Sequence, residues 1–333
     1  MLLNRQRNII IAFFLIVVVV VLATEFYLPK DFNQPTKAVF LVQKGMNSKE
    51  IATNLQQKGL IKSDLFFRIY VIMFGQRTKL QAGRYDISSG MSMATIAQKI
   101  ASGETIKNTV TVIEGWDVQD MAEYLADKKI YTMDDFLRAT KATHQQFSFL
   151  QDKPAKLSLE GYLFPDTYEI SGSETADELV IDMLNNFDKK LTPDLRSEIK
   201  KQKKSIFQIV TMASILEKEV KTLDDKKMVA GILWKRIAEG MPLQVDATVN
   251  YITRKDHAGA LIADTKIDSP YNTYKYYGLP LGPISSPGID SLRAAIYPTK
   301  SNYWFYLSDP KTGKTIFSKT LDEHNHAVAK YLK

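Results

Sequence analysis

One helical segment carries the best candidate for acid–base chemistry. In residues 205–221, apolar side chains recur at helical spacing, and Glu217 stands at the margin of the apolar face. The small residues Ala213 and Ser214, one turn earlier, leave space beside that carboxyl. A carboxyl at such a margin is partly desolvated, which raises its pKa towards the range that a general acid needs. A boundary glutamate without any catalytic role would give the same pattern.

A second carboxyl follows closely on the same helix. Glu219 lies two residues beyond Glu217, which is a rotation of about 200° around an α-helix. We therefore expect Glu219 to face solvent, and we do not expect the two carboxyls to act on one bond. No other carboxylate that would work together with Glu217 stands out in the sequence.

Metal, cofactor and nucleophile chemistry find little support. The chain has no cysteine. His324 and His326 lie in an acidic stretch, but their i, i+2 spacing points them to different faces of a helix, and no HExxH sequence exists. We interpret this stretch as the surface-exposed start of a C-terminal helix. There is no G-x-S-x-G elbow or glycine-rich nucleotide loop. We expect neither a metal nor a cofactor.

Three segments near the C-terminus have the composition of rigid, polar loops. They are rich in glycine, proline, amides and tyrosine, which offer hydrogen-bonding and stacking groups. Sugar-binding sites are built from such groups, and so are many inert turns. The segments are residues 243–249, 269–274 and 278–288.

The N-terminus predicts a membrane anchor. Arg5 and Arg7 precede an unbroken apolar run over residues 9–23, and aromatic residues extend it to about 20 residues, enough to cross a ~30 Å hydrocarbon core. The arginines place residues 1–8 in the cytoplasm and the bulk of the chain on the periplasmic or extracytoplasmic side. We assign residues 9–28 to a single-pass anchor in the cytoplasmic membrane and residues 29–36 to a linker. A signal peptide cleaved near Ala23 is the alternative.

The net charge of +7 is mildly basic and suits attraction to anionic surfaces. No zinc-finger, RNP or helix-turn-helix sequence accompanies it, so we do not expect a nucleic-acid partner. The densest basic run, residues 200–204, is interpreted as a solvated segment between two helices.

A pattern recurs three times in the first part of the chain. Gly45, Gly90 and Gly115 are each followed, six residues later, by an apolar–alanine pair and then by another apolar residue one turn on. These positions share one helix face, and each glycine is expected in the turn before the helix, where a positive φ costs glycine little. The first copy resembles LysM, a small βααβ module that binds glycans containing N-acetylglucosamine. A purely structural α/β repeat is the alternative.

The remaining chain predicts an α+β fold with helices near 174–190, 205–221 and 224–239 and a closing helix from about Leu321. The C-terminal third is expected to form loops with short strands, one of them at residues 303–307. Together these elements predict an N-terminal transmembrane helix, a LysM-like βααβ subdomain over residues 37–105 and a mixed α/β catalytic domain over residues 106–333.

Several sequence motifs together resemble the YceG-like endolytic murein transglycosylases. They lie in the same order as in that family, and the resemblance covers essentially the whole chain; the motifs are residues 213–219, 159–168, 271–274, 278–288 and 323–325. The resemblance implies that Glu217 is the catalytic glutamate. It also implies cleavage of the MurNAc–GlcNAc β-1,4 bond within nascent peptidoglycan strands, with 1,6-anhydroMurNAc ends, terminating elongation beside the penicillin-binding synthases. One carboxylate suffices there because the sugar's own C6 hydroxyl is the nucleophile, whereas ordinary glycosidases need two.

Substrate contacts are predicted in the loops. The candidates are Gln244, Asp246, Tyr271, Asn272 and Ser286. Leu281, Ser286 and Ala247 depart from the residues usual in the family, which loosens the loops but leaves the glutamate in place. The alternative function is a non-catalytic peptidoglycan-binding scaffold of the cell-wall synthesis machinery.

Overall fold

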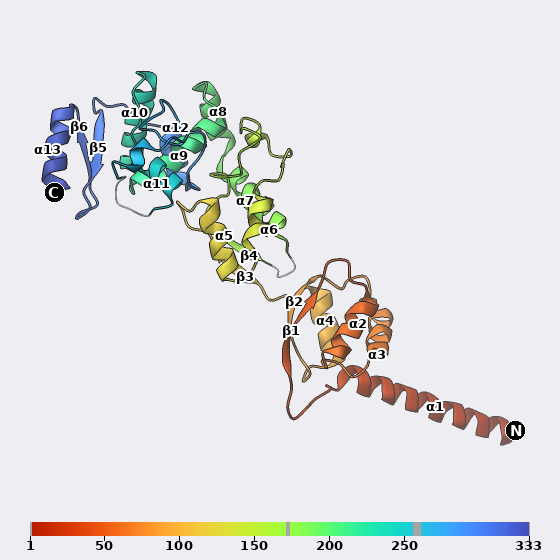
Figure 1. Ribbon diagram of the computed structural model, residues 1–333. Helices are drawn as coiled ribbons and strands as arrows, with labels where there is room; N and C mark the ends of the chain where they lie inside the picture. The colour runs from red at the N-terminus through yellow and green to blue at the C-terminus, as the bar shows by residue number, and fades with distance from the viewer. Residues whose placement is uncertain (1, 171–173, 256–260, 333) are drawn as a thin grey trace. The chain divides into compact units, whose positions relative to one another are not determined.

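The computed structural model describes residues 2–170, 174–255 and 261–332. The chain divides into two compact units, Met1–Thr109 with Glu169–Glu174, and Val110–Tyr168 with Thr175–Lys333. Helices dominate, and the strands of the described residues form small two-stranded sheets (Figure 1). In this coarse sense the expected α+β composition is confirmed.

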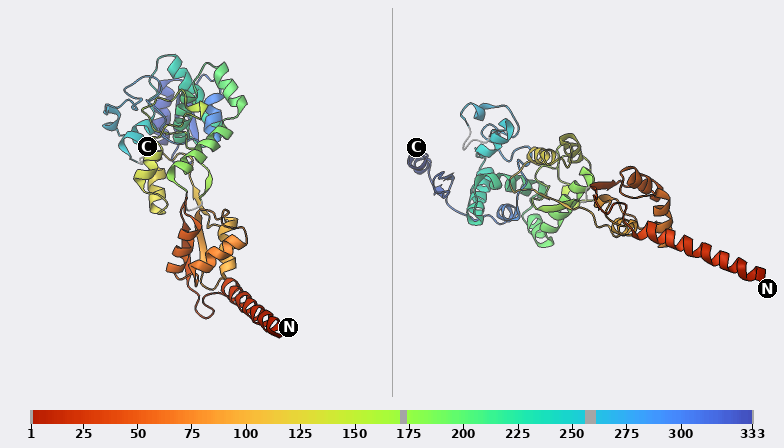
Figure 2. Two further views of the ribbon diagram at one scale, coloured as in Figure 1. Left: turned by 90° about the vertical axis from the view of Figure 1, so that its right-hand side faces the viewer. Right: turned by 90° about the horizontal axis from the view of Figure 1, so that it is seen from below.

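The first unit opens with α1 (Leu2–Tyr27), a single 26-residue helix. Within it, Arg5–Tyr27 is long and apolar enough to cross a membrane, which fits a membrane anchor or a signal sequence. Figures 1 and 2 show it projecting from its unit. Its end does not project: Phe26 is buried at 3% exposure in the hydrophobic core of the unit.

The body of the first unit has the order strand, helix, helix, strand, followed by a further helix. The elements are β1 (Lys37–Val42), α2 (Ser48–Gln57), α3 (Asp64–Met73), β2 (Gly83–Ser88) and α4 (Met93–Ser102). β1 and β2 pair antiparallel, with Phe40 opposite Tyr85. Successive strand residues face opposite sides of a sheet, so Phe40 is buried whereas its neighbours Val39 and Leu41 are exposed.

The three repeated glycines differ in backbone conformation. Gly45 and Gly115 adopt the expected positive φ, +90° and +84°, in the turns before α2 and α5 (Val118–Asp127). The prediction is wrong for Gly90, which precedes α4 without a positive φ. There a Cβ would lie 2.8 Å from Cβ of Pro35, so Gly90 is needed for close approach of the linker.

Two short strands and the first helices of the second unit follow. β3 (Asn108–Thr111) pairs with β4 (Thr167–Ile170). The intervening chain contains α5, α6 (Met133–Ala139) and a short 3-10 helix at Ser148–Leu150. The third copy of the glycine pattern therefore folds, like the first, as a strand, a turn and two helices.

The rest of the second unit is a helical assembly around one central helix. Its elements are α7 (Ala176–Lys190), α8 (Pro193–Lys201), α9 (Ile206–Glu219), α10 (Leu223–Ala238), α11 (Asp246–Thr253), a 3-10 helix at Asp264–Lys266, α12 (Ile289–Ile296), the antiparallel pair β5 (Phe305–Ser308) and β6 (Thr315–Ser318), and α13 (Leu321–Tyr331). The predicted helices at α7, α9, α10 and α13 are confirmed. α8, α11 and α12 were not predicted, and the last two replace part of the expected loop region.

Candidate active site

α9 is the helix that positions both candidate carboxyls. Ser205 caps its N-terminus, and Ser205 and Gln208 form a reciprocal capping box. Every residue from 209 to 216 is buried, and the helix packs against α10, α11 and α12. The sequence predicted an amphipathic helix, but this segment is buried on all sides. The first turn of α9, with the exposed Gln208, and its last turn, which carries Glu217 and Glu219, lie outside this fully buried stretch.

Glu217 is held by donors from two neighbouring helices. Its Oε1 accepts a hydrogen bond from Nζ of Lys226 on α10 at 2.8 Å, and the two side chains are only 8% and 5% exposed. Its Oε2 accepts from the backbone N–H of Gly288 at 2.9 Å and from the hydroxyl of Ser291 at 2.7 Å. Gly288 is the N-cap of α12. A cation and a helix N-terminus therefore surround this carboxyl, an arrangement that stabilises a carboxylate ion.

A second carboxyl, not singled out by the sequence, lies against this site. A Cβ on Gly288 would fall 1.9 Å from Oε1 of Glu114, so the glycine is needed for Glu114 to approach. Burial and then the charge of Glu217 raise the pKa of Glu114 above its usual value, while Lys226 opposes the shift. Glu114 follows the repeat's strand and directly precedes Gly115, which was identified only as a turn glycine.

The space above Glu217 is occupied by a loop. Ser214 accepts a hydrogen bond from the backbone N–H of Ile284 at 3.0 Å, and its carbonyl accepts one from the hydroxyl of Ser285, also at 3.0 Å. The small side chains that were predicted to leave room for the carboxyl therefore make room for the segment around residues 284–286. This segment leads into Gly288 and brings that N–H to Glu217.

Glu219 has a different environment on the same turn of α9. The side chain is partly buried, and its Oε2 accepts a hydrogen bond from the hydroxyl of Tyr306 on β5 at 2.9 Å. The expectation that Glu219 faces solvent is wrong. β5, which overlaps the strand predicted at residues 303–307, and the N-terminus of α11, which falls in a predicted loop, cover that side of the helix.

The protonation equilibrium of Glu219 is strongly displaced. Burial raises its pKa to about 7; the hydrogen bonds from Tyr306 and from the backbone of Ala247 oppose this shift, and the charge of Asp246 adds to it. Near neutral pH this carboxyl exists in both forms. General acid–base catalysis by a single group needs such a pKa.

One of the predicted substrate contacts, Asp246, lies near Glu219, and another, Gln244, precedes Asp246 by two residues. Asp246 begins α11 and accepts a hydrogen bond from the hydroxyl of Tyr274 at 2.5 Å. Gln244 is exposed and has a φ of +52°, uncommon for a residue with a side chain. Its backbone N–H donates to the carbonyl of Thr273 at 3.1 Å, which joins the predicted loops 243–249 and 269–274.

Two other predicted contacts are wholly buried. The side-chain amide of Asn272 donates to the carbonyls of Thr265 and Ile267 at 2.9 and 2.8 Å. Ser286 exchanges backbone hydrogen bonds with Gly115 and Trp116. Both residues are fully buried, and these contacts favour loop-holding roles for them.

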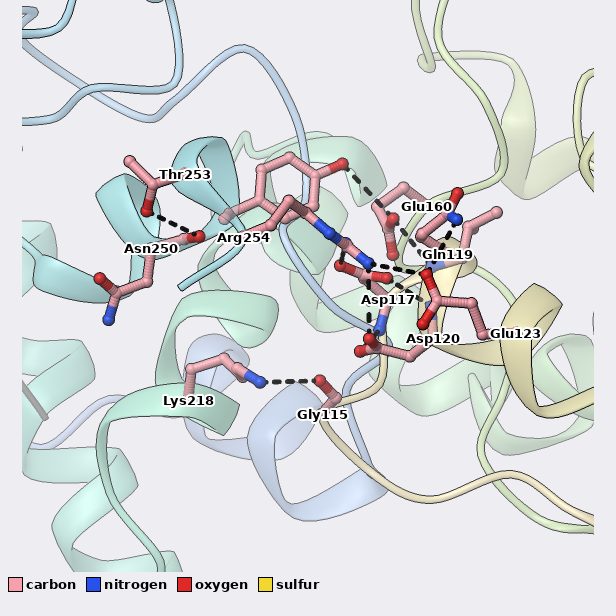
Figure 3. Close-up of polar contacts among 12 residues, drawn as sticks. Gly115, Asp117, Gln119, Asp120, Glu123, Glu160, Lys218, Asn250, Thr253 and Arg254 are labelled. Carbon is pink, nitrogen blue, oxygen red and sulfur yellow. Dashed lines mark hydrogen bonds and ion pairs between the residues drawn. The ribbon is translucent and has the colours of Figure 1, made fainter. Parts of the chain in front are cut away.

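The fifth predicted residue, Tyr271, packs beside a separate polar cluster that includes Asp117, Glu160 and Arg254, which Figure 3 shows. Its ring lies 5.0 Å from that of Tyr251 on α11, whose hydroxyl lies 3.4 Å from Oε2 of Glu160. The same oxygen accepts from the backbone N–H of Val118 at 3.1 Å. Arg254, at the end of α11, pairs with Asp117, the N-cap of α5. This cluster joins α11 to α5.

Glu160 is the most perturbed carboxyl of this cluster. It is 6% exposed, and its Oε1 is buried without a hydrogen-bond partner in the structure. Burial raises the pKa of Glu160 to about 8, and the charge of Asp117 adds to the effect. Its sequence context, an acid between Leu159 and Gly161 in an aromatic segment, is a signal that could have drawn attention to it.

Metal binding receives no support from the geometry. Within the ranges that the structure describes, no three His, Cys, Asp or Glu side chains lie together as they would around an ion. The polar chemistry of the described part of this unit is carried instead by the carboxyls around the end of α9 and their hydrogen-bond donors.

Comparison with known proteins agrees with the sequence resemblance. The model of the YceG-like family matches residues 40–330. An endolytic murein transglycosylase of Bacillus subtilis (strain 168) is 35% identical over 320 residues, 91% of this chain and 87% of the relative. One of Streptococcus pneumoniae (strain D39) is 32% identical over 333 residues, 92% of this chain and 60% of the relative.

A solved structure is also similar. The crystal structure of a putative YceG-like protein of Listeria monocytogenes matches with a TM-score of 0.60 and 34% identity, covering 88% of this chain and 100% of that one. The family predicted from the sequence motifs is confirmed by these matches. The chain belongs to the YceG-like family.

Proposed function

We propose that this protein is a membrane-anchored endolytic murein transglycosylase. It cleaves the MurNAc–GlcNAc β-1,4 bond within nascent peptidoglycan strands and leaves 1,6-anhydroMurNAc ends, which terminates elongation of the strand. Family membership and the names of the Bacillus and Streptococcus relatives support this reaction. The observation that carries it is the pair of enclosed carboxyls at the end of α9, Glu217 and Glu219, each held by hydrogen-bond donors from neighbouring elements.

The choice of catalytic acid lies between the two glutamates of that turn. The sequence resemblance assigns Glu217. The contacts favour Glu219, because a general acid must carry a proton, and Glu217 accepts hydrogen bonds from a lysine ammonium, an N–H and a hydroxyl. We therefore propose Glu219 as the acid, and Glu217 as a buried anion that fixes α10 and the N-terminus of α12 to α9.

The reaction needs one carboxyl acting twice. Protonated Glu219 donates its proton to the glycosidic oxygen while the bond from that oxygen to C1 of MurNAc breaks. The C6 hydroxyl oxygen of the same MurNAc bonds to C1, and the Glu219 carboxylate accepts the proton that this hydroxyl loses. The products are a 1,6-anhydro end and a free hydroxyl on the departing sugar, and the carboxyl is protonated again. No water is consumed.

The surroundings of Glu219 include groups that favour its protonated form and groups that favour its ionised form. Desolvation and the neighbouring Asp246 favour the acid, whereas the hydroxyl of Tyr306 and the N–H of Ala247 favour the carboxylate. Among the predicted substrate contacts, the partly buried Asp246 lies beside this carboxyl, and Gln244, two residues earlier, is exposed. We propose these two as sugar-binding residues.

The first unit is proposed to serve location and binding. Its β1-α2-α3-β2 order supports a LysM-like, glycan-binding role. The apolar α1 supports a single-pass anchor in the cytoplasmic membrane with the enzyme outside, near penicillin-binding synthases.

The alternative is a non-catalytic peptidoglycan-binding scaffold, which the same βααβ order and basic charge would also serve. Purified, uncrosslinked glycan strands incubated with the full-length protein and examined by mass spectrometry separate the two. The proposed enzyme shortens the strands and produces 1,6-anhydro ends in proportion to time. Strands that are bound but remain at full length, without anhydro ends, would establish the scaffold instead.

A further inference from the structure

α3 is apolar on the face that the protein does not bury. Phe67, Tyr70 and Val71 pack into the core of the first unit. On the opposite side, Ile72 and Met73 are 58% and 60% exposed, and other large apolar side chains, Leu65 and Phe74, extend the surface at either end. A helix that is apolar all round is normally covered on every side.

The C-terminal end of α3 is fixed beside the end of α1. The ring of Phe26 lies 5.1 Å from that of Tyr70 and 6.4 Å from that of Phe74, in both cases edge to face. Phe26 is itself buried in the core of the unit. The distance of the exposed α3 residues from the end of the apolar helix is therefore set by packing, not by a flexible linker.

The length of α1 indicates how deep in the bilayer the contact between the ends of α1 and α3 lies. Twenty residues counted from Ile9, at ~1.5 Å each, span the ~30 Å hydrocarbon core and end at Leu28. If α1 crosses the membrane as proposed above, Phe26 and Tyr27 lie at its outer boundary. Phe74, in contact with Phe26, lies at the same level, and Ile72 and Met73 lie within one helical turn of it.

Charge beyond the C-terminal end of α3 fits an anionic bilayer. Arg77 and Lys79 follow this end and are exposed, while at the other end Lys62 is exposed and Arg68 pairs with the helix's own Asp64 at 3.6 Å. Basic residues at the rim of an apolar surface attract anionic phospholipid headgroups while the apolar side chains enter the interfacial layer.

We propose that Ile72, Met73 and Phe74 form a membrane-contact surface that enters the outer interface of an anionic phospholipid bilayer beside α1. This inference rests on the proposed membrane anchor. It gives the first unit a second attachment to the bilayer, so that the unit is held in one orientation and does not rotate freely about the end of α1.

The chain's lack of cysteine makes a direct depth measurement clean. Single variants Met73→Cys, Val39→Cys and Val18→Cys of the full chain are labelled with an environment-sensitive fluorophore. They are reconstituted into vesicles of phosphatidylcholine alone or with phosphatidylglycerol. Val39 is a matched control, because it is an exposed apolar residue on β1 of the same unit. A label at position 18, in the middle of α1, reports whether the anchor spans the membrane.

The fluorescence emission of the label at position 73 should be shifted to the blue. The label should be protected from aqueous iodide and quenched by nitroxide on the lipid headgroup. The shift should grow with phosphatidylglycerol, while the label at position 39 remains fully open to iodide. A membrane-embedded label at 18 with an aqueous label at 73 overturns this inference alone. Aqueous labels at both positions overturn the anchor and this inference together.

Discussion

Glu217 and Glu219 are separated by one residue on α9 and have opposite surroundings. Glu217 meets the ammonium of Lys226 besides an N–H, a hydroxyl and the carboxyl of Glu114, whereas Glu219 meets a tyrosine hydroxyl, a backbone N–H and the carboxylate of Asp246. Their different rotation around the helix produces this difference. Neighbouring carboxyls placed in contrasting environments are a familiar way for an enzyme to separate a fixed charge from a proton donor.

Activity should fall as the pH rises through neutrality. Glu219 must start the reaction protonated, and burial raises its pKa to about 7. The protonated fraction therefore decreases about tenfold per pH unit well above that value. Initial rates of anhydro-end formation on soluble strands, measured from pH 5.5 to 9, give the profile. A rate that keeps rising up to pH 9 would exclude a protonated Glu219 as the reactive form.

Lys226→Met should destabilise the second unit strongly. The substitution leaves the buried Glu217 without its cation, and breaking one side of a buried ion pair costs about 3–5 kcal/mol. Thermal unfolding followed by circular dichroism measures the loss. Lys221→Met, at an exposed lysine close in sequence, is the control and should leave the transition unchanged. Equal unfolding temperatures for both variants would show that the Lys226–Glu217 ion pair contributes nothing to stability.

At the scale of elements, α11 connects two polar clusters. Its N-terminus carries Asp246 beside Glu219, and its C-terminal residues Tyr251 and Arg254 contact Glu160 and Asp117 near α5. The cluster at the far end of α11 therefore holds the helix whose first residue, Asp246, influences the carboxyl that we propose as the acid, Glu219.

Glu160→Gln should flatten the dependence of stability on pH. The pKa of Glu160 is raised to about 8, so between its unfolded value near 4.5 and pH 8 the folded chain retains a proton that the unfolded chain releases. The free energy of unfolding therefore falls with rising pH, by up to about 1.4 kcal/mol per unit from this group. Denaturant unfolding of both proteins at pH 5 and pH 8 provides the test. If the wild-type protein loses no more free energy of unfolding between pH 5 and pH 8 than the variant does, the raised pKa of Glu160 is contradicted.

The helices of the second unit that the sequence predicted correctly are long ones. α7, α9, α10 and α13 have 15, 14, 16 and 11 residues, and the glycine repeat marked the turns before α2 and α5. α11 and α12 were missed because each has only eight residues in a context rich in glycine and proline, so little more than two turns of pattern exist. Gly90 was misjudged because its role depends on contact with the distant Pro35.

The candidate site was predictable only in part for a related reason. Helix periodicity located the end of α9, but two carboxyls one residue apart are distinguished by what packs on each side of the helix. Those partners are Lys226, Ser291 and Tyr306, and the last two lie more than 70 residues away along the chain. Glu114 and Glu160 were missed because they become site residues only through contacts of that kind.

At the scale of the whole molecule, the apolar helix and the first unit form one folded body. Phe26 lies in the core of that unit, and Leu22 packs against it. Removal of residues 1–28 therefore removes part of a core as well as an anchor. A fragment that keeps the core of this unit intact must therefore begin at or before Leu22.

A fragment starting at Pro29 should have a less stable first unit than one starting at Leu22. Loss of the buried Phe26 side chain costs about 3–5 kcal/mol, as for other large-to-small core changes. Both fragments should cut soluble strands, because the second unit contains all of the proposed catalytic groups. Hydrogen exchange of α3 and α4 in the two fragments measures the difference, and equal protection would contradict it.

The most direct test of the central claim compares Glu219→Gln with Glu217→Gln on purified glycan strands, with Glu239→Gln, at an exposed glutamate, as the control. Each protein is first shown to be folded at the assay temperature, and 1,6-anhydro ends are then quantified by mass spectrometry. The account predicts that Glu219→Gln abolishes the anhydro ends. Folded Glu217→Gln should retain measurable activity with lower thermal stability, and the control should match wild type. Full activity in Glu219→Gln with complete loss in folded Glu217→Gln would contradict the account and return the catalytic role to Glu217.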